Sequence, residues 1–336
     1  MPEHGGDLAR ASRKHGIPVE RWLDLSTGIN PLGYPVPQVP ATDWLRLPGS
    51  SESLLRAARD YYQTDYMLPV AGTQAAILAL PRLRSRSRVM LGALTYNEYA
   101  HTWKRHGHAV QAVPICELDQ HLAQTDVLIV CNPNNPTGER IDSVQLLEWH
   151  ARLSAHGGWL IVDEAYIDTT PEASLTPHAT RPGLIVLRSL GKFFGLAGAR
   201  IGFAFASVDL LRALQDVLGP WTVSGPAQFV AGAALADRVW QARTRAALIK
   251  AGQHLNALLA RAGVAAQGTA LFQWWQNEQA GALHRELARQ AVLTRWFGHA
   301  EPGGIRFGLP GIEEEWRRLE QSLERCKNYR EKTRCE

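Results

Sequence analysis

Residues that could take part in covalent catalysis follow two short apolar runs of the sequence. Lys192 comes shortly after the run Leu184–Leu187, with glycine before it and two phenylalanines behind it. A lysine among such neighbours can supply the free amine that forms an imine with a carbonyl compound. Asp163 and Tyr166 follow another apolar run and add a carboxylate and a phenol. Taken singly, a solvated surface lysine and a helix-capping aspartate are plainer interpretations.

Other post-strand segments carry groups that suit an anion. Gly72, Thr73 and Gln74 precede a predicted helix, and the first N–H groups of a helix can bind a phosphate. Ser189 contributes a hydroxyl group and Arg200 a positive charge. Helix capping alone explains a Gly-Thr start about equally well.

These residues can lie close together only if the strands that precede them end at a common edge of one sheet. The predicted strands are apolar at consecutive positions, which is typical of parallel strands buried on both faces. Ligands bind such sheets beyond the carboxyl ends of their strands. The predicted strands cover residues 88–91, 126–131, 159–162, 184–187 and 201–206, and helical spacing is found in residues 53–62, 74–83, 144–154 and 209–218.

The fold class predicted is α/β, a mainly parallel central sheet covered by helices together with a smaller α+β domain. Residues 1–40 are expected to form an N-terminal arm associated with the small domain. Residues 41–228 form the predicted large domain and 229–336 the small C-terminal domain. The last part is predicted to contain a long helical stretch from 226 to about 262, strands at 270–275 and 304–309, and a final helix from 312.

Taken together, and in this order along the chain, the loop Asn132–Gly138, Asp163, Lys192 and Arg200 resemble the fold-type I pyridoxal-phosphate (PLP) enzymes of the aminotransferase class. The resemblance covers nearly the whole chain. It implies PLP as the cofactor, with Lys192 bound covalently to it and Asp163 paired with its pyridine nitrogen.

The same resemblance implies the other cofactor contacts. Asn135 and Tyr166 match positions that hydrogen-bond the phenolic oxygen of the ring, and Tyr96 matches the aromatic residue that stacks on it. Lys192, Asp163 and Tyr166 are the predicted catalytic residues, and no metal is expected. The predicted cofactor-binding residues are Gly72, Thr73, Gln74, Tyr96, Asn135, Asp163, Tyr166, Ser189, Lys192 and Arg200.

The N-terminal segment narrows the choice within that class. His4-Gly5-Gly6 and the segment Trp22–Pro31 are similar to the opening of the L-threonine-O-3-phosphate decarboxylases of cobalamin biosynthesis, and Pro220–Ser224 matches them as well. The resemblance implies decarboxylation of L-threonine O-3-phosphate to (R)-1-amino-2-propanol O-2-phosphate and CO2.

A phosphorylated amino acid carries two anionic groups that need partners. Arg306 matches the arginine that binds the α-carboxylate in these enzymes, because a guanidinium pairs with a carboxylate through two parallel hydrogen bonds. Arg295 is the candidate for the substrate phosphate. The predicted substrate-binding residues are His4, Gly5, Gly6, Gly28, Ile29, Asn135, Arg295 and Arg306.

Composition excludes several classes of protein. The 336 residues include 36 Lys+Arg and 32 Asp+Glu, a formal charge of +4, with 45% hydrophobic residues, which is typical of a globular enzyme. We expect neither a nucleic-acid nor a membrane partner, since no polybasic run or long apolar stretch occurs. Four cysteines without a disulfide or zinc spacing indicate a cytoplasmic protein. A homodimer is expected from the resemblance.

Two alternatives stay open at this point. The first is an aminotransferase of the histidinol-phosphate type, because the bond that breaks depends on which substituent of the α-carbon stands perpendicular to the cofactor ring. The second is a non-catalytic PLP-binding regulatory module, which would need neither Lys192 nor Arg306.

Overall fold

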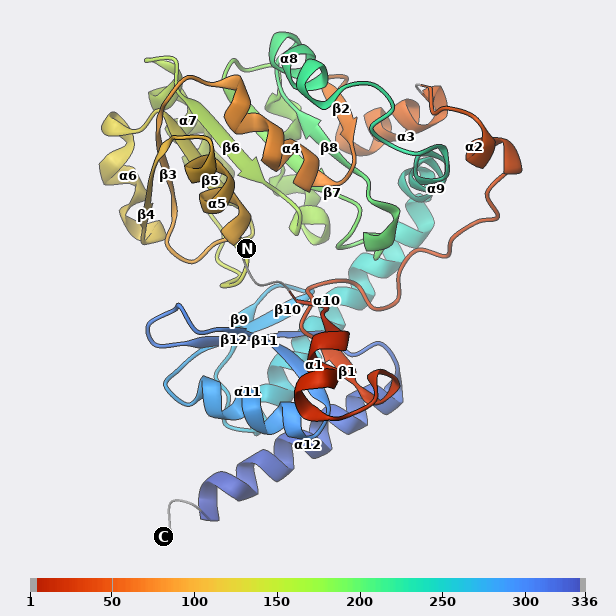
Figure 1. The fold of residues 1–336 in the computed structure, drawn as a ribbon, viewed down its shortest axis with the longest axis vertical. Helices are drawn as coiled ribbons and strands as arrows, with labels where there is room; N and C mark the ends of the chain where they lie inside the picture. The colour runs from red at the N-terminus through yellow and green to blue at the C-terminus, as the bar shows by residue number, and fades with distance from the viewer. Residues whose placement is uncertain (1–4, 50, 333–336) are drawn as a thin grey trace. The chain divides into compact units, whose positions relative to one another are not determined.

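The computed structural model of the protein describes residues 5–49 and 51–332, with side chains up to residue 327 (Figure 1). It divides into two compact units. The larger unit comprises residues 33–135 and 139–244, and the smaller unit comprises residues 136–138, 245–332 and the described residues up to 32.

These bounds differ from the predicted ones at 40 and 228. The Tyr34 N–H donates to the Phe194 carbonyl of the larger unit, so the chain joins that unit soon after residue 32. Helix α9 (Gly225–Ala236) packs along α3 (Glu52–Tyr62), which places residues beyond 228 in the larger unit as well.

The larger unit is built on a seven-stranded sheet with the order β2-β8-β7-β6-β5-β3-β4. All neighbouring strands run parallel except β8, which is antiparallel to both β7 and β2. The predicted mainly parallel sheet is therefore confirmed. The strands are β2 (Met67–Val70), β3 (Arg88–Gly92), β4 (Ala109–Val113), β5 (Val127–Cys131), β6 (Trp159–Asp163), β7 (Leu184–Ser189) and β8 (Gly202–Phe205).

Helices cover this sheet because alternate strand residues point to opposite faces and both sets are apolar. Residues of α4, α5 and α8 join one buried cluster with Ile161 and Ile185 of the central strands. Helix α7 packs against β6. Besides α3 and α9, the helices of this unit are α2 (Ala41–Leu45), α4 (Thr73–Ala79), α5 (Asn97–Arg105), α6 (Leu118–His121), α7 (Ser143–Ser154) and α8 (Val208–Leu218).

The smaller unit contains a second sheet of five strands, in the order β1-β11-β12-β10-β9. Strand β1 comes from the N-terminal segment and pairs with β11 in parallel, whereas the other pairs are antiparallel. Its elements are α1 (Leu8–His15), β1 (Leu23–Leu25), β9 (Gln267–Gly268), β10 (Phe272–Gln276), α11 (Ala280–Arg289), β11 (Val292–Phe297), β12 (Gly304–Gly308) and α12 (Glu313–Lys332). Helix α10 (Arg238–Arg261) begins in the larger unit and ends in the smaller one.

The predicted helical stretch from 226 to about 262 consists of two helices, α9 and α10, which Asp237 divides. This residue ends α9, and its carboxylate accepts the Trp240 N–H at 2.9 Å, as the N-cap of a new helix does. Strands β1, β2, β4, β9 and β11 were also not predicted. Of these, β2 and β4 lie at the edges of the large sheet, where one side of a strand lacks a neighbour and continuous apolar residues are not required.

In the part of the chain that the structure describes, no helix has the length and apolar character needed to cross a bilayer.

His284 on α11 is a buried titratable group of the smaller unit. Its Nδ1 lies 2.8 Å from Thr294 Oγ1, and its ring stacks on Trp296. Burial, aided by the nearby cations Lys14 and His15, lowers the pKa of His284 to about 4. The folded unit therefore holds this imidazole neutral.

We expect the free energy of unfolding to fall as pH drops from about 6.5 to about 4. In this range His284 binds a proton in the unfolded chain but stays neutral in the folded protein. His284→Gln should remove this contribution, on the order of 2 kcal/mol. Denaturant unfolding at pH 7 and pH 4.5 measures it. Exposed His101→Gln is the control, and a pH dependence equal in wild type and His284→Gln would contradict the assignment.

Candidate active site

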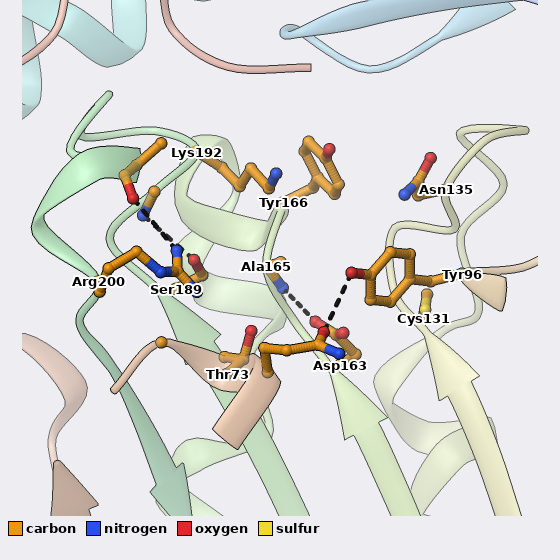
Figure 2. A pocket seen from close by; sticks show the side chains of 14 residues that line it. Thr73, Tyr96, Cys131, Asn135, Asp163, Ala165, Tyr166, Ser189, Lys192 and Arg200 are labelled. Carbon is orange, nitrogen blue, oxygen red and sulfur yellow. Dashed lines mark hydrogen bonds between the residues drawn. The ribbon is translucent and has the colours of Figure 1, made fainter. Parts of the chain in front are cut away.

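An open cavity of about 700 Å³ lies in the larger unit (Figure 2). The residues around it come from the ends of β5, β6 and β7 and from the starts of α4 and α5, which is the edge where parallel sheets bind ligands. The lining residues are Gly72, Thr73, Gln74, Tyr96, Cys131, Asn135, Asp163, Ala165, Tyr166, Ser189, Gly191, Lys192, Ala197 and Arg200.

All ten residues predicted to bind the cofactor are in this set, although they span residues 72 to 200. The structure therefore brings them together. Their individual roles remain predictions. Cys131, Ala165, Gly191 and Ala197 line the cavity without having been predicted.

Asp163 is the buried carboxylate of the cavity, at the last position of β6. Its Oδ2 accepts the Tyr99 hydroxyl at 2.8 Å, and its Oδ1 accepts the Ala165 N–H at 3.0 Å. Burial raises the pKa of Asp163, while these two hydrogen bonds and the charge of Lys192 act in the opposite direction. A cationic partner inside the cavity would stabilise the ionised form of this carboxylate.

Lys192 lies in the loop that follows β7, and Tyr166 lies in the loop that follows β6. The lysine Nζ is 5.7 Å from the centre of the Tyr166 ring, and both side chains border the cavity (Figure 2). The parallel pairing of β6 with β7 holds the two loops next to each other. An amine, a phenol and a carboxylate thus share one cavity, as the sequence predicts.

An anion cradle is formed where β8 meets α4. Gly72 has a φ of +69°, and a Cβ atom there would lie 2.5 Å from Arg200 Nη2, so only glycine leaves room for the guanidinium. Ser189, on β7, lies opposite Gly202 of β8 and lines the same cavity. A guanidinium, a hydroxyl and the first N–H groups of a helix suit a phosphate.

The Asn-rich loop after β5 has both a structural and a site-facing part. The Asn132 side chain accepts from the Ile141 N–H and donates to the Ile141 carbonyl, both at 2.9 Å. Asn134 donates to the Leu94 carbonyl at 2.7 Å. The hydrogen bonds of Asn132 and Asn134 stabilise the conformation of the loop, while Asn135 lines the cavity.

A chain of hydrogen bonds orients Tyr96. Its hydroxyl donates to Gln74 Oε1 at 3.1 Å, and Gln74 Nε2 donates to Glu98 Oε2 at 2.9 Å. Because the Gln74 amide nitrogen donates to Glu98, the amide oxygen of Gln74 is the atom that accepts from Tyr96. Burial raises the pKa of Tyr96, which keeps its hydroxyl protonated.

Glu98 and Tyr99 were missed from the sequence. Tyr96 and Tyr99 are three residues apart at the start of α5, so they lie on one side of that helix. This spacing was a usable signal, but helix α5 itself was not predicted.

Cys131 is the last residue of β5, and burial raises the pKa of its thiol to about 12, so this thiol stays neutral.

The predicted substrate residues that the structure describes lie in the smaller unit, except Asn135. Arg306 is buried and donates from Nη2 to the Ser26 carbonyl at 2.8 Å. The Gly6 N–H donates to the hydroxyl of the same serine at 2.7 Å. The segment from Gly5 to Ile29 is thus hydrogen-bonded to β12 through the Ser26 carbonyl. His4 lies outside the described residues.

Arg295 and Arg306 are directly opposite each other on the antiparallel strands β11 and β12. Opposite residues in such a pair point to the same face of the sheet. The two guanidinium groups lie over the rings of Phe297 and Phe272, respectively. Two cations on one face suit a ligand with two anionic groups.

The cavity fits pyridoxal phosphate by its donor set. Lys192 provides an amine for the aldehyde, Asp163 a buried carboxylate for the ring nitrogen, and the cradle at Arg200 positive charge for the phosphate. Within the described residues, no group of three or more His, Cys, Asp or Glu is placed to hold a metal ion.

Comparison with known proteins agrees with this chemistry. The family model "Aminotransferase class I and II" matches residues 47–319. The chain belongs to this family. The fold class predicted from the sequence is confirmed by the same match and by the sheet described above.

Two relatives from this family are similar over nearly their whole length. The chain is 50% identical over 324 residues to a threonine-phosphate decarboxylase of Pseudomonas aeruginosa, covering 96% of this chain and 97% of that protein. It is 42% identical over 332 residues to a threonine-phosphate decarboxylase of Sinorhizobium sp, with the same coverage.

Among solved structures, a histidinol-phosphate aminotransferase from Sinorhizobium meliloti in complex with pyridoxal-5'-phosphate has a TM-score of 0.82 to this chain. The identity is 19%, and the match covers 96% of this chain and 95% of that one. This likeness shows a shared fold.

We expect Gly72→Ala to weaken pyridoxal-phosphate binding about tenfold, or about 1.4 kcal/mol, because the new methyl group displaces Arg200 from the cradle. Fluorescence titration of the apo protein with the cofactor measures the dissociation constant. Gly198→Ala is the matched control, since a Cβ there meets nothing within 4 Å. Equal affinity of Gly72→Ala and wild type would contradict the cradle.

Proposed function

We propose that this protein is a PLP-dependent decarboxylase that converts L-threonine O-3-phosphate to (R)-1-amino-2-propanol O-2-phosphate and CO2. The observation that carries the proposal is the similarity to two threonine-phosphate decarboxylases over 96% of the chain. The cavity supports it, because it contains an amine, a carboxylate and an anion cradle in one place.

When bound, pyridoxal phosphate withdraws electrons from the α-carbon of an amino acid and so lets the bond to the carboxylate break. This chain would hold the cofactor through Lys192, Asp163 and the cradle at Arg200. Asn135 and Tyr166 would donate to the ring oxygen, and Tyr96 would cover the ring face.

Asp163 would hold a proton between its carboxylate and the ring nitrogen. The carboxylate is buried and oriented by Tyr99 and the Ala165 N–H, so it cannot rotate away without losing both hydrogen bonds. A fixed acceptor in a water-poor site acts more strongly than the same group in water.

Lys192 has a second task after binding. Loss of CO2 leaves the α-carbon one substituent short, and a proton must take the place of the carboxylate. The Lys192 amine borders the cavity beside Tyr166, and it is the group we assign to deliver that proton.

Arg306 and Arg295 are proposed to bind the two anionic groups of the substrate. We assign the α-carboxylate to Arg306 and the phosphate to Arg295, with Gly5, Gly6, Gly28 and Ile29 in the adjoining segment. The placement of both arginines on one face of the small sheet supports this assignment.

We predict that the PLP-loaded protein, incubated with L-threonine O-3-phosphate and no keto acid, releases equimolar CO2 and aminopropanol phosphate. Mass spectrometry detects the products. Lys192→Ala should abolish release, whereas exposed Lys104→Ala should not alter it. Turnover that requires 2-oxoglutarate and histidinol phosphate would instead identify an aminotransferase, and binding without any turnover would indicate a regulatory module.

We also propose a homodimer. Apolar side chains around α2 are exposed, among them Trp44 and Leu45 at 68% and 83%. They adjoin two grooves of the larger unit that share Pro48 and Gly49, and Trp221 lines one of them. Exposed apolar surface of this kind favours burial against another protein surface, and a second copy of the chain is the proposed partner.

The double variant Trp44→Glu/Leu45→Glu should sediment as a monomer, while wild type sediments at twice the mass of one chain. The reason is that two buried carboxylates oppose association. Val144→Glu on α7 is the control, because this valine is also an exposed apolar residue, at 62%. A wild-type monomer with full activity would contradict the dimer.

Cobalamin biosynthesis is the pathway we propose, since the decarboxylases that the N-terminal segment resembles supply its aminopropanol phosphate. The cytoplasm is the proposed location. Cysteine spacing that fits no disulfide framework supports this placement.

A further inference from the structure

A buried ionic cluster lies beneath the floor of the cavity without lining it. We call the residues Arg188, Glu164, Asp168, Ser174 and Tyr61 the Arg188 cluster. The Arg188 guanidinium pairs with Asp168 and Glu164, and it donates to Ser174 Oγ at 2.9 Å. Tyr61 on α3 donates its hydroxyl to Asp168 at 2.8 Å. Side chains of the three ionic residues are at most 2% exposed.

Strand alternation places the cluster opposite the cavity. Asp163 on β6 is paired in register with Leu187 on β7, and the next residues are Glu164 and Arg188. Because neighbouring residues of a strand point to opposite faces, Asp163 and Leu187 share one face while Glu164 and Arg188 share the other. Asp163 and Glu164 are thus adjacent at the end of β6, and Arg188 and Ser189 are adjacent on β7. Each pair consists of one cavity residue and one cluster residue.

Such a cluster is an unusual feature for the interior of a sheet protein. Removing charges from water is costly, and a buried ion pair is often no more stabilising than an apolar substitute. Burial raises the pKa of Glu164 to about 7, despite the opposing effect of Arg188. Stability alone is therefore a weak explanation for placing three ionic groups here.

We propose that Arg188 and Glu164 are positioning residues that hold Asp163, Tyr166 and Ser189 at the cofactor. The inference rests on the proposed PLP chemistry. The three ionic residues of the cluster adjoin these cavity residues in sequence. Glu164 directly follows Asp163, Arg188 directly precedes Ser189, and Glu164 and Asp168 flank Tyr166.

Ion pairs of the cluster hold both ends of the loop that carries Tyr166. Glu164 and Asp168 lie two residues before and two residues after this tyrosine, and both bind the one guanidinium of Arg188. Glu164 also accepts from Ser174 and from the Leu175 N–H at 2.7 Å, so the carboxylate is held from two directions. The loop between Glu164 and Asp168 therefore has little conformational freedom.

The cluster also reaches the Lys192 loop. Arg188 directly precedes Ser189, which accepts the Gly191 N–H at 3.1 Å next to the lysine. The Tyr61 ring packs edge-on against Phe194, two residues beyond Lys192. One side of the lysine loop is thus set by Arg188 and the other by Tyr61.

The test uses the full-length protein and two conservative variants, Glu164→Gln and Tyr61→Phe. Each keeps the shape of its side chain, so both should fold. We expect Glu164→Gln to raise the dissociation constant of pyridoxal phosphate about tenfold and to shift the pH midpoint of the bound cofactor's absorption band by at least about half a unit. Tyr61→Phe should act in the same direction and more weakly.

Leu146→Ala is the matched control, because Leu146 is fully buried on α7 and takes no part in the cluster. It should lower the melting temperature without changing the affinity or the absorption midpoint. If Glu164→Gln leaves both properties at wild-type values, or if Leu146→Ala changes them as much at an equal loss of melting temperature, the cluster is merely structural and the proposal is wrong.

These measurements use no substrate, so they are independent of the reaction catalysed. A shifted absorption midpoint together with no release of CO2 from L-threonine O-3-phosphate would support positioning and overturn the proposed function. Normal decarboxylation together with unaltered cofactor binding in Glu164→Gln would do the reverse.

Discussion

The parallel pairing of β6 with β7 is the constraint on which the rest of the site depends. The pairing sets Asp163 opposite Leu187, and Lys192 then lies only five positions beyond Leu187 in the chain. The carboxylate and the amine consequently enter one cavity from neighbouring loops. A change of register by one residue would turn Asp163 to the other face of the sheet and put Glu164 in its place.

Burial determines what this pairing can do chemically. Asp163 is buried, and its charge is supported by the Tyr99 hydroxyl and the Ala165 N–H, so a cation in the cavity meets a fixed carboxylate that water screens only weakly. Arg200 approaches the cavity because Gly72 has no side chain. The electrostatics of the site thus follow from close packing around a few polar groups, and not from the small net charge of the chain.

Much of the cavity lining was predictable from the sequence because most of the residues predicted to bind the cofactor follow an apolar strand or begin a helix, whereas Arg200 precedes a strand. Lys192, Asp163 and Asn135 are examples, since their strands are buried on both faces and therefore easy to recognise. Glu98 could not be found in this way, because its role depends on a hydrogen bond to a side chain 24 residues away. Arg188 was not among the residues predicted to form the site, and its partners became visible once β6 and β7 were paired.

The most direct test of the account is the site of cofactor attachment. Sodium borohydride reduces a carbon–nitrogen double bond between pyridoxal phosphate and a lysine to a stable single bond, and peptide mass spectrometry then locates the added mass. The account predicts one modified peptide, which contains Lys192. Label on another lysine, such as Lys104 or Lys250, or no label at all, would contradict the assignment of the cavity as the PLP site.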